Sequence, residues 1–589
     1  MSTETAKMTN QEQEMVHLTI NNIPLAVPKG TKIMQAAQEL GIDIPHLCYH
    51  EDQRIKARCR LCSVEVVGKR RLLAACSTEV WEGMEVHTDT QIVRDTQVAI
   101  LQLMLANHHK DCLSCPRNQN CDLQRLCSRF NIQHSSLPSV CKEEPRIVTN
   151  PAIVRDPSKC IRCGRCIRAC KDVQGIAALT YAGRSSDIIV TTAYNKPMEA
   201  TDCVLCGQCS LACPTGAIVE RDATAKVLWA IQSRQKHVIC QVAPAVRVAL
   251  GDAFGLKPGA IATGQMVTAL KLLGFDKVFD TNFGADLTIM EEGMEFLDRL
   301  KNGGTLPMMT SCCPAWVTFM EKEYGESLEH LSSAKSPMMM FGAVAKTVYP
   351  KVAGVSPDDI VTVAIMPCTA KKAEIQRKEM LRDGKQDVDY VLTTRELIKL
   401  IKSVGLTFND LPESDFDSPL GEATGAGAIF GATGGVMEAA LRTVYEKATG
   451  KTLEKIDFED VRGMQGIKEA TVDLGSRTVH IAVAHTLKNA AKLMKDVRSG
   501  TSPYDFIEVM ACPGGCVGGG GQPIGTTRAV TRERIKAIYE IDKSLPRRKS
   551  HENPVIQKLY ADHLDAPLSE KAHALLHTHY TPVPPAYEF

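Results

Sequence analysis

Eight cysteines between residues 160 and 213 share a spacing that strongly limits what this part of the chain can bind. Each half of the run follows the pattern C-x2-C-x2-C-x3-C, and Pro214 follows the second half; the members are Cys160, Cys163, Cys166, Cys170, Cys203, Cys206, Cys209 and Cys213. Short gaps let one loop supply three corners of an iron–sulfur cubane, and the fourth cysteine of each half binds the other cluster. The spacing therefore predicts two [4Fe–4S] clusters. One is expected on Cys160, Cys163, Cys166 and Cys213, and the other on Cys203, Cys206, Cys209 and Cys170.

The remaining cysteines are numerous enough to suggest further metal sites. The chain has 589 residues and 23 cysteines, and disulfide scaffolds of comparable cysteine content are short secreted chains. A chain of this length is expected to fold into several domains. Its net charge of +1 gives no overall field that favours nucleic acid, and no apolar stretch is long enough to span a membrane. The polar N-terminus has no signal-peptide core, so we expect a cytoplasmic protein with reduced thiols.

The first cysteine set follows a short strand–turn–strand pattern. Apolar residues alternate over 16–20 and 23–27 around Asn21–Asn22, and residues 31–40 have a helical pattern with Thr31 as a plausible N-cap. The cysteines that follow are Cys48, Cys59, Cys62 and Cys76. This order resembles the β-grasp [2Fe–2S] domain of plant-type ferredoxins, in the wider-spaced form of hydrogenases and of the large iron–sulfur subunit of NADH dehydrogenase. Four thiolates also suit zinc, which remains the alternative.

A second set follows a helix predicted over 95–107. It has the pattern H-x3-C-x2-C-x5-C, formed by His108, Cys112, Cys115 and Cys121. One imidazole and three thiolates can bind a [4Fe–4S] cluster or zinc, and His109 competes with His108 as the ligand. The same pattern occurs in the two families just named, which favours the cluster and His108. A neutral imidazole in place of a thiolate raises the reduction potential of such a cluster.

From about residue 237 the sequence alternates short apolar strands with helices, which predicts an α/β domain with a largely parallel sheet. Candidate strands are 237–243, 277–280, 305–310, 361–366, 478–484 and 505–510, and helices are expected over 285–300 and 486–496. Three of these strands run directly into the cysteines Cys312, Cys313, Cys368, Cys512 and Cys516. Because ligands bind beyond the carboxyl ends of parallel strands, the three loops are expected to meet. Four thiolates there could hold one more cubane, and an ordinary fourth [4Fe–4S] site is the simplest interpretation.

Three stretches in this half resemble the signature sequences of the [FeFe]-hydrogenase active-site domain. They are TSCCPAW at 310–316, MPCTAKKAE at 366–374 and EVMACPGGCVGGGGQP at 508–523, in the family's order. The resemblance extends over nearly the whole chain, because the N-terminal cluster modules match independently. It implies an H-cluster: a [4Fe–4S] cubane on Cys313, Cys368, Cys512 and Cys516, with Cys516 also bridging to a diiron unit that carries CO, cyanide and azadithiolate. The expected cofactors are thus one [2Fe–2S], three accessory [4Fe–4S] clusters and the H-cluster.

The resemblance also implies roles for residues that do not ligate the cubane. Lys371 would donate hydrogen bonds to an anionic cyanide, and Met366 and Met510 would lie near the diiron unit. Cys312 would pass protons to the azadithiolate amine, and the family's relay continues through Glu292, Ser332, Glu295 and Arg299. The spacing of Glu292, Glu295 and Arg299 places them on one helix face, although such a face is commonly a solvated charge stripe.

Three residues depart from the single-chain clostridial enzymes. Ala315 replaces a glycine, Ala245 a serine and Met338 a glutamine, and the last two are expected in the surroundings of the diiron unit. They put catalytic bias and oxygen sensitivity in doubt rather than the class of reaction.

The expected fold is multidomain, combining α+β and α/β modules. We predict a β-grasp [2Fe–2S] domain (1–94), a His/Cys3 [4Fe–4S] domain (95–145), a two-[4Fe–4S] ferredoxin domain (146–225), the H-cluster domain (226–529) and a small-subunit-like segment (530–589). The expected activity is the reversible conversion of H2 into protons and electrons.

No G-x-G-x-x-G motif follows a strand, and the glycine-rich run at 421–435 has the wrong spacing for one. NAD(P) or flavin chemistry would therefore need partner subunits, an arrangement that we favour over a stand-alone ferredoxin-dependent hydrogenase. A sensory hydrogenase would carry a PAS-like domain, which the sequence does not suggest. A non-catalytic iron–sulfur assembly factor is a more remote alternative, because such proteins lack the complete TSCCP stretch.

Overall fold

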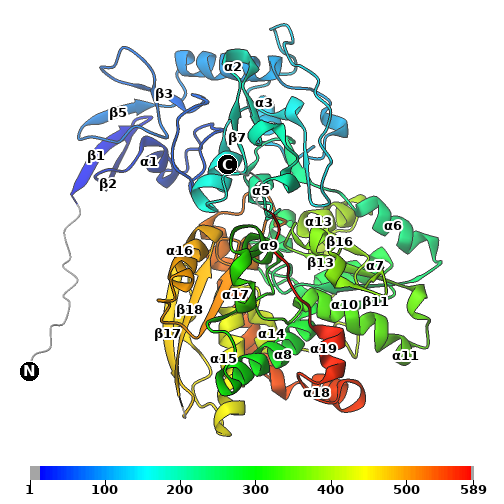
Figure 1. Ribbon diagram of the computed structural model, residues 1–589. Helices are drawn as coiled ribbons and strands as arrows, with labels where there is room; N and C mark the ends of the chain where they lie inside the picture. Colours follow the sequence, from blue (N-terminus) through cyan, green and yellow to red (C-terminus); the bar gives the residue numbers. More distant parts are fainter. Residues whose placement is uncertain (1–13, 476, 585–589) are drawn as a thin grey trace, which may run out of the picture.

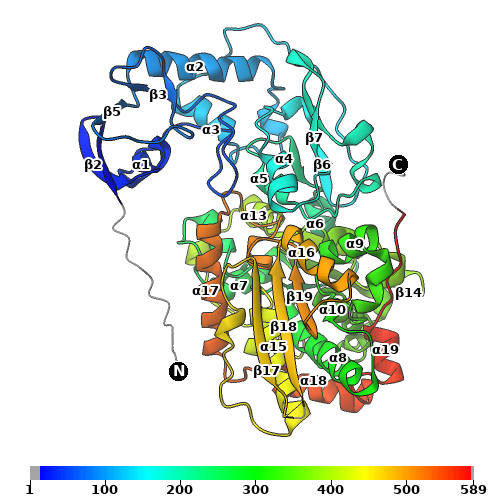
Figure 2. The same ribbon diagram turned by 60° about the vertical axis from the view of Figure 1, so that its left-hand side comes forward.

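The computed structural model describes residues 14–475 and 477–584 and divides the chain into two parts (Figures 1 and 2). The cysteine-rich modules of the first 220 residues or so lie together at one end, and the α/β domain with the C-terminal helices forms the other. Residues 1–13, part of the polar N-terminus on which the expected location depends, and residues 585–589 of the predicted C-terminal segment lie outside the described residues. Within the described residues, no helix is long and apolar enough to cross a membrane.

The N-terminal module is a five-stranded sheet with one short helix against it. The strands are β1 (Met15–Ile20), β2 (Ile23–Pro28), β3 (Ser63–Val66), β4 (Leu73–Ala74) and β5 (Met84–His87), in the order β2-β1-β5-β3-β4. Asn21 and Asn22 both have positive φ, as a tight hairpin turn requires, so the predicted strand–turn–strand is confirmed. Helix α1 (Ile33–Glu39) is capped by Lys32. The predicted Thr31 cap is therefore wrong, because the Thr31 hydroxyl donates instead to the Pro28 carbonyl at 2.6 Å.

Two further modules connect this sheet to the α/β domain. The His/Cys3 set lies between α2 (Gln91–Ala106) and α3 (Asp122–Arg129). The repeated cysteine run carries α4 (Arg165–Arg168) and α5 (Gln208–Ala212), with β6 (Ile153–Arg155) paired to β9 (Ile218–Glu220). The long insertion between the two halves forms the hairpin of β7 (Thr180–Ala182) and β8 (Ile189–Thr191).

The α/β domain contains two four-stranded, largely parallel sheets, which confirms the predicted α/β fold with parallel sheets; the assignment of strands to the two sheets was not predicted. In the first, β11 (Lys277–Asp280), β10 (His237–Val242), β13 (Ile360–Met366) and β16 (Tyr390–Thr393) are all parallel. The second has the order β12 (Met308–Met309), β19 (Phe506–Met510), β18 (Thr478–His485) and β17 (Ile467–Asp473), and only β17 is antiparallel. An apolar run shows that a segment is a buried strand but does not specify its partner, so this division was not visible in the sequence.

Helices pack around and between these sheets. The long helix α8 (Thr281–Asn302) contacts α10 (Pro337–Thr347) and α15 (Gly435–Thr449), and α16 (Leu487–Arg498) follows β18. Both α8 and α16 were predicted, with starts a few residues off. The shorter elements α9 (Pro314–Glu323) and α12 (Lys371–Glu374) begin immediately after the cysteine-bearing loops.

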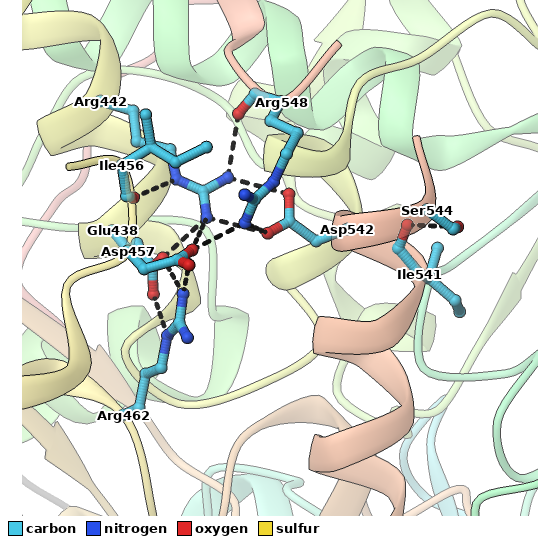
Figure 3. Close-up of polar contacts among 9 residues, drawn as sticks. All are labelled: Glu438, Arg442, Ile456, Asp457, Arg462, Ile541, Asp542, Ser544 and Arg548. Atoms are coloured by element: carbon cyan, nitrogen blue, oxygen red, sulfur yellow. Dashed lines mark hydrogen bonds and ion pairs between the residues drawn. The ribbon is translucent and has the colours of Figure 1, made fainter. Parts of the chain in front are cut away.

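The C-terminal segment wraps the α/β domain through α17 (Arg528–Ser544), α18 (Pro554–Leu559) and α19 (Glu570–Leu576). A buried charge network anchors it (Figure 3). Arg442 of α15 donates to Asp542 of α17 at 2.9 Å and to Glu438 at 2.7 Å, and all three side chains are fully buried. Arg548 and Arg462 complete the network around Asp457, each at 2.7 Å. Because removing one member would leave a buried charge unpaired, this network holds the segment firmly in place.

Candidate active site

Three loops from the two sheets meet at one cavity in the α/β domain. Cys312 and Cys313 follow β12, Cys368 follows β13, and Cys512 and Cys516 follow β19. The cavity is lined by all five cysteines together with Met366, Met510 and Lys371. The structure therefore brings together residues that lie about 200 positions apart in the sequence. Both sheets contribute strand ends to this cavity: β13 from one, and β12 and β19 from the other.

The four expected cubane ligands form a set that favours binding of a cationic cluster. Burial raises the pKa of Cys313, Cys368, Cys512 and Cys516, and for Cys368, Cys512 and Cys516 the neighbouring thiols raise it further, Cys368 to about 11. Bare thiolates would thus be unfavourable here, whereas iron ions would compensate four converging negative charges. The donor chemistry fits an iron–sulfur cubane.

Two glycines let the backbone pass close to this site. Gly515 has a φ of +95°, and a Cβ atom there would lie 2.6 Å from the Thr433 amide nitrogen. A Cβ atom on Gly520 would lie 2.2 Å from the Cys206 carbonyl oxygen. Any side chain at either position would push apart the loops that carry the cysteines.

Lys371 is a buried cation beside the cavity, not a solvated lysine at a helix start. Its ammonium lies 3.3 Å from the Cys312 carbonyl oxygen and forms an ion pair of 2.8 Å with Glu374. Burial would lower the pKa of Lys371, but Glu374 and the thiols of Cys368 and Cys312 raise it above its ordinary value. The side chain therefore stays charged and can donate to an anionic ligand in the cavity.

Cys312 lines the cavity, and the Glu292 carboxyl of α8 is close enough to affect its thiol. Burial raises the pKa of Cys312 well above that of an ordinary thiol, and the adjacent Glu292 carboxylate raises it further. Burial and then Glu295 raise the pKa of Glu292 to about 8. One Glu292 oxygen accepts from the Ser311 amide at 3.4 Å, and the other is buried with no hydrogen-bond partner among the described residues. A buried carboxyl with this pKa can accept and release a proton near neutral pH.

The outer members of the expected relay are joined by hydrogen bonds. Ser332 Oγ donates to Glu295 Oε2 at 2.8 Å, and Arg299 Nη2 donates to Glu295 Oε1 at 2.7 Å. Glu292, Glu295 and Arg299 all belong to α8, as their spacing predicted. The Arg299 guanidinium also donates to the carbonyls of residues 305, 329 and 331, so it is fixed near the surface.

Met366, the last residue of β13, and Met510, the last residue of β19, both line the cavity. Met338 also lines it, whereas Ala245 is fully buried and is not among the lining residues. The replacement of glutamine by methionine therefore changes the cavity wall directly, and the alanine at 245 lies behind that wall.

The cysteines expected to share each cluster of the repeated run lie near one another. The thiols of Cys160, Cys163 and Cys166 interact electrostatically with Cys213, and those of Cys203, Cys206 and Cys209 interact with Cys170. In the N-terminal module, Cys48 is adjacent to Cys59 and Cys62 to Cys76. The members of these three expected ligand sets therefore lie near one another, and in each crossed set one cysteine comes from a distant part of the sequence.

His108 and His109 differ in the way that a ligand choice requires. His108 is buried, and one of its ring nitrogens has no hydrogen-bond partner in the described structure. Burial and then Lys159 lower the pKa of His108 to about 4, so the imidazole is neutral and free to bind metal. His109 is more exposed and faces Glu143 at 3.3 Å. The geometry favours His108.

One functional candidate escaped the sequence analysis. Glu508, in the middle of β19, is fully buried and accepts from the amides of Gly434 and Met437, each at 2.7 Å, at the N-terminus of α15. Its charge acts on Cys312, Cys516 and Glu292. A single acid inside an otherwise apolar strand was the signal that could have revealed it.

Comparison with protein families assigns nearly all of the chain. Residues 236–520 match the iron only hydrogenase large subunit, C-terminal domain, and residues 528–583 match the iron hydrogenase small subunit. Residues 13–91 match a 2Fe-2S iron-sulfur cluster binding domain, which favours that cluster over zinc. Residues 97–136 match the NADH-ubiquinone oxidoreductase-G iron-sulfur binding region, and 156–217 a 4Fe-4S dicluster domain.

Characterised relatives agree with these matches over nearly the full length. The chain is 48% identical to the NADP-reducing hydrogenase subunit HndD of Solidesulfovibrio fructosivorans, covering 96% of this chain and 99% of the relative. It is 40% identical to iron hydrogenase 1 of Clostridium pasteurianum, covering 96% and 100%. A solved [FeFe]-hydrogenase, HydA1 of Chlamydomonas reinhardtii, is 43% identical with a TM-score of 0.55, covering 62% of this chain and 99% of that chain.

The assembly-factor alternative is represented by more distant relatives. Protein NAR1 of Arabidopsis thaliana is 31% identical over 71% of this chain and 93% of its own length. The similarity to hydrogenases is both higher and more extensive.

Proposed function

Because this chain belongs to the iron-only hydrogenases, we propose that it is the catalytic subunit of a multisubunit hydrogenase that exchanges electrons between H2 and an NAD(P)-linked or ferredoxin-linked partner. The convergence of Cys313, Cys368, Cys512 and Cys516 on one cavity, with the proton-carrying candidate Cys312 beside them, is the observation that supports this most directly. A complete ligand set next to a proton path is what H2 chemistry needs.

The proposed cofactor set is one [2Fe–2S], three accessory [4Fe–4S] clusters and an H-cluster on Cys313, Cys368, Cys512 and Cys516. When bound, the diiron unit supplies a metal with an open position and a neighbouring amine, which together split or form H2. The protein's own contributions are anchoring, charge and proton transfer. Lys371 holds a positive charge against the cavity, and Met366, Met510 and Met338 keep its wall apolar.

Protons are proposed to move between the cavity and the surface through Cys312, Glu292, Ser332 and Glu295. The pKa of about 8 for Glu292 lets it alternate between its acid and its carboxylate near neutral pH. Ser332 then connects this region to Glu295, whose carboxylate is held by Arg299. Each of these four groups can both accept and donate a proton. Arg299 cannot release its proton, and it instead holds the Glu295 carboxylate in position.

Electrons are proposed to pass from one cluster module to the next, because the loops of neighbouring modules are in contact. The Thr369 hydroxyl, next to Cys368, donates to the Leu205 carbonyl at 2.7 Å. This contact joins the site of Cys203, Cys206, Cys209 and Cys170 to the catalytic cavity. Cys115 packs against Gly216 near Cys213, and Arg168 donates to the Cys48 carbonyl, so both outer modules reach the same ferredoxin module.

An exposed basic loop supports docking of an acidic electron-transfer partner at the outer modules. Arg54, Lys56, Arg58 and Arg60 are all exposed, and none forms an ion pair with a carboxylate among the described residues, although Arg58 lies over the Tyr181 ring, 4.1 Å from its centroid. Arg58, Arg60 and Arg162 line a groove together with Cys59, Cys160 and Cys163. Unpaired cations next to two cluster sites would attract a negatively charged carrier and orient it for electron transfer. The relative HndD is named as a subunit of an NADP-reducing hydrogenase, which favours partner subunits here too.

The proposed location is the cytoplasm. All 23 cysteines are free, in keeping with reducing surroundings. One relative, the large subunit of Nitratidesulfovibrio vulgaris, is named as periplasmic, so fractionation of the native host is the measurement that decides.

The proposal is tested by anaerobic purification from a host that makes the diiron cofactor. We expect infrared bands of bound CO and cyanide, iron sufficient for all five sites, H2-dependent reduction of a dye and co-purifying partner chains. Iron without CO and cyanide bands, and no H2 turnover after maturation, would contradict the catalytic assignment. Full dye-linked activity in a chain that never associates with partners would instead favour the stand-alone ferredoxin-dependent enzyme.

A further inference from the structure

The C-terminal segment places a histidine in direct hydrogen-bond contact with the outer end of the proton path. His577 follows α19 and is almost fully buried, with 8% of its surface exposed. Its Nδ1 lies 2.8 Å from Ser333 Oγ, and Ser333 Oγ lies 3.2 Å from Glu295 Oε2. Glu295 therefore has Arg299, which holds its carboxylate in place, on one side and the Ser333–His577 pair on the other.

This position of His577 is fixed by the backbone. The Thr578 amide donates to the Ser333 carbonyl, and the Lys335 amide donates to the Leu576 carbonyl, each at 2.8 Å. These bonds pair the C-terminal segment with residues 333–335 as a short antiparallel bridge. On its other side, His577 Nε2 lies 2.9 Å from Glu291 Oε2, and Glu291 is fully buried. Glu291 also accepts from the Tyr560 hydroxyl and, at 2.9 Å, from the Leu568 amide.

Two hydrogen-bond arrangements satisfy these groups, and they differ by the position of one proton. In the first, His577 is neutral, its Nε2–H donates to Glu291, and the Ser333 hydroxyl donates to Nδ1. In the second, His577 carries both ring protons, and the Ser333 hydroxyl donates to Glu295. A proton on Glu295 converts the first into the second: it passes to Ser333 Oγ while the original hydroxyl proton passes to Nδ1.

We propose that His577 is a proton-storing station beside the proton path, taking a proton from Glu295 through the Ser333 hydroxyl and returning it by the same route. The buried Glu291 carboxylate stabilises the imidazolium that forms on transfer. The exposed His573 contacts the His577 ring, with ring centroids 4.1 Å apart, but both ring nitrogens of His577 are already bonded to Ser333 and Glu291, so the proton is held at His577. The titratable groups around His577 are Glu291 and Glu295 of α8, His573 of α19, Tyr560, and His579. This inference rests on the proposed function, because it concerns the path that serves the catalytic cavity.

The test compares Ser333→Ala, His577→Gln and the double variant in dye-linked H2 evolution. Because the proton reaches His577 only through the Ser333 hydroxyl, each single variant should lose about 10-fold in rate, and the double variant should lose no more than the larger single effect. A His577→Gln rate equal to that of the wild type, or a double variant that loses the product of the two single effects, would overturn the proposal. His579→Gln, an exposed histidine two residues away, is the matched control and should behave like the wild type.

A structural role for His577 is distinguished by two further measurements. His577→Gly should regain rate when imidazole is added, because a free base can replace the missing ring, and its infrared CO and cyanide bands should match those of the wild type. Its unfolding midpoint should fall, because Glu291 loses a buried partner. A loss of rate that imidazole does not restore would show that His577 only anchors the segment, which would also overturn the proposal. If the wild type itself has no such bands and no H2 turnover, the proposed function fails instead.

Discussion

The iron–sulfur modules and the catalytic domain build metal sites from cysteines in opposite ways. In the modules, most ligands of a site lie within a dozen residues of one another, as in Cys160, Cys163 and Cys166. In the catalytic domain, the four expected ligands come from three loops on two different sheets. A local site needs only a correctly shaped loop, whereas the catalytic site exists only after the whole domain has folded. Binding of iron by thiolates therefore depends mainly on local sequence in the iron–sulfur modules and on long-range packing in the catalytic domain.

The largest effect is expected from removing one thiolate in each half. Cys512→Ala should abolish H2 turnover and the infrared CO and cyanide bands, because the cubane loses a ligand in the site that everything else serves. Cys62→Ala should remove only the [2Fe–2S] signal and leave H2 evolution from a small reduced dye largely intact. Electron paramagnetic resonance and dye-linked assays measure both. Retention of H2 turnover in Cys512→Ala would show that Cys512 is not a required ligand of the catalytic cluster.

A loss of about 100-fold to 10,000-fold is expected from Cys312→Ser, because the proton donor beside the cavity is replaced by a group with a much higher pKa. The iron content and the infrared bands should remain. Wild-type rates of H2 production in this variant would refute the assigned proton role. Cys240→Ser, in the core strand β10 and away from the cavity, is a control in which any loss should follow stability rather than proton transfer.

The buried charge network of the catalytic domain should contribute much more to stability than an exposed ion pair of the modules. Arg442→Met should destabilise the catalytic domain by about 3–5 kcal/mol, because Asp542 and Glu438 would be left buried without their partner. Arg129→Met in the modules removes an exposed pair with Asp43 and should cost about 1 kcal/mol or less. Thermal unfolding followed by circular dichroism distinguishes the two. Equal shifts in both variants would contradict the structural role of the network.

The smallest effect is a pH dependence. Burial raises the pKa of Glu292 to about 8, so the folded protein holds this proton more tightly than the unfolded chain. The stabilising contribution is complete below the ordinary carboxyl pKa, and it is lost as the pH rises through about 8. Glu292→Gln should therefore flatten the dependence of the unfolding midpoint on pH between about 4.5 and 8, the interval between the ordinary and the raised pKa of this carboxyl. An unchanged slope would mean that Glu292 titrates normally.

Much of the site could be predicted because cluster ligands follow spacing rules. The crossed cysteine sets, the β-hairpin around Asn21–Asn22 and the placement of Glu292, Glu295 and Arg299 on one helix all follow from local pattern. Thr31 failed as a cap because its hydroxyl found a closer partner in the preceding turn. The division into two sheets and the buried acid Glu508 could not be deduced, since strand partners and side-chain surroundings are set by the fold.

Residue type and short spacing were enough to identify the residues that can bind iron and the order of the modules, because both are local properties of the chain. The fold was needed to see that β12, β13 and β19 end at one cavity, that Lys371 is buried beside Cys312, and that His577 returns from the C-terminal segment to meet Ser333. Contacts between residues hundreds of positions apart depend on how complete sheets and helices pack, and local pattern carries no information about that packing.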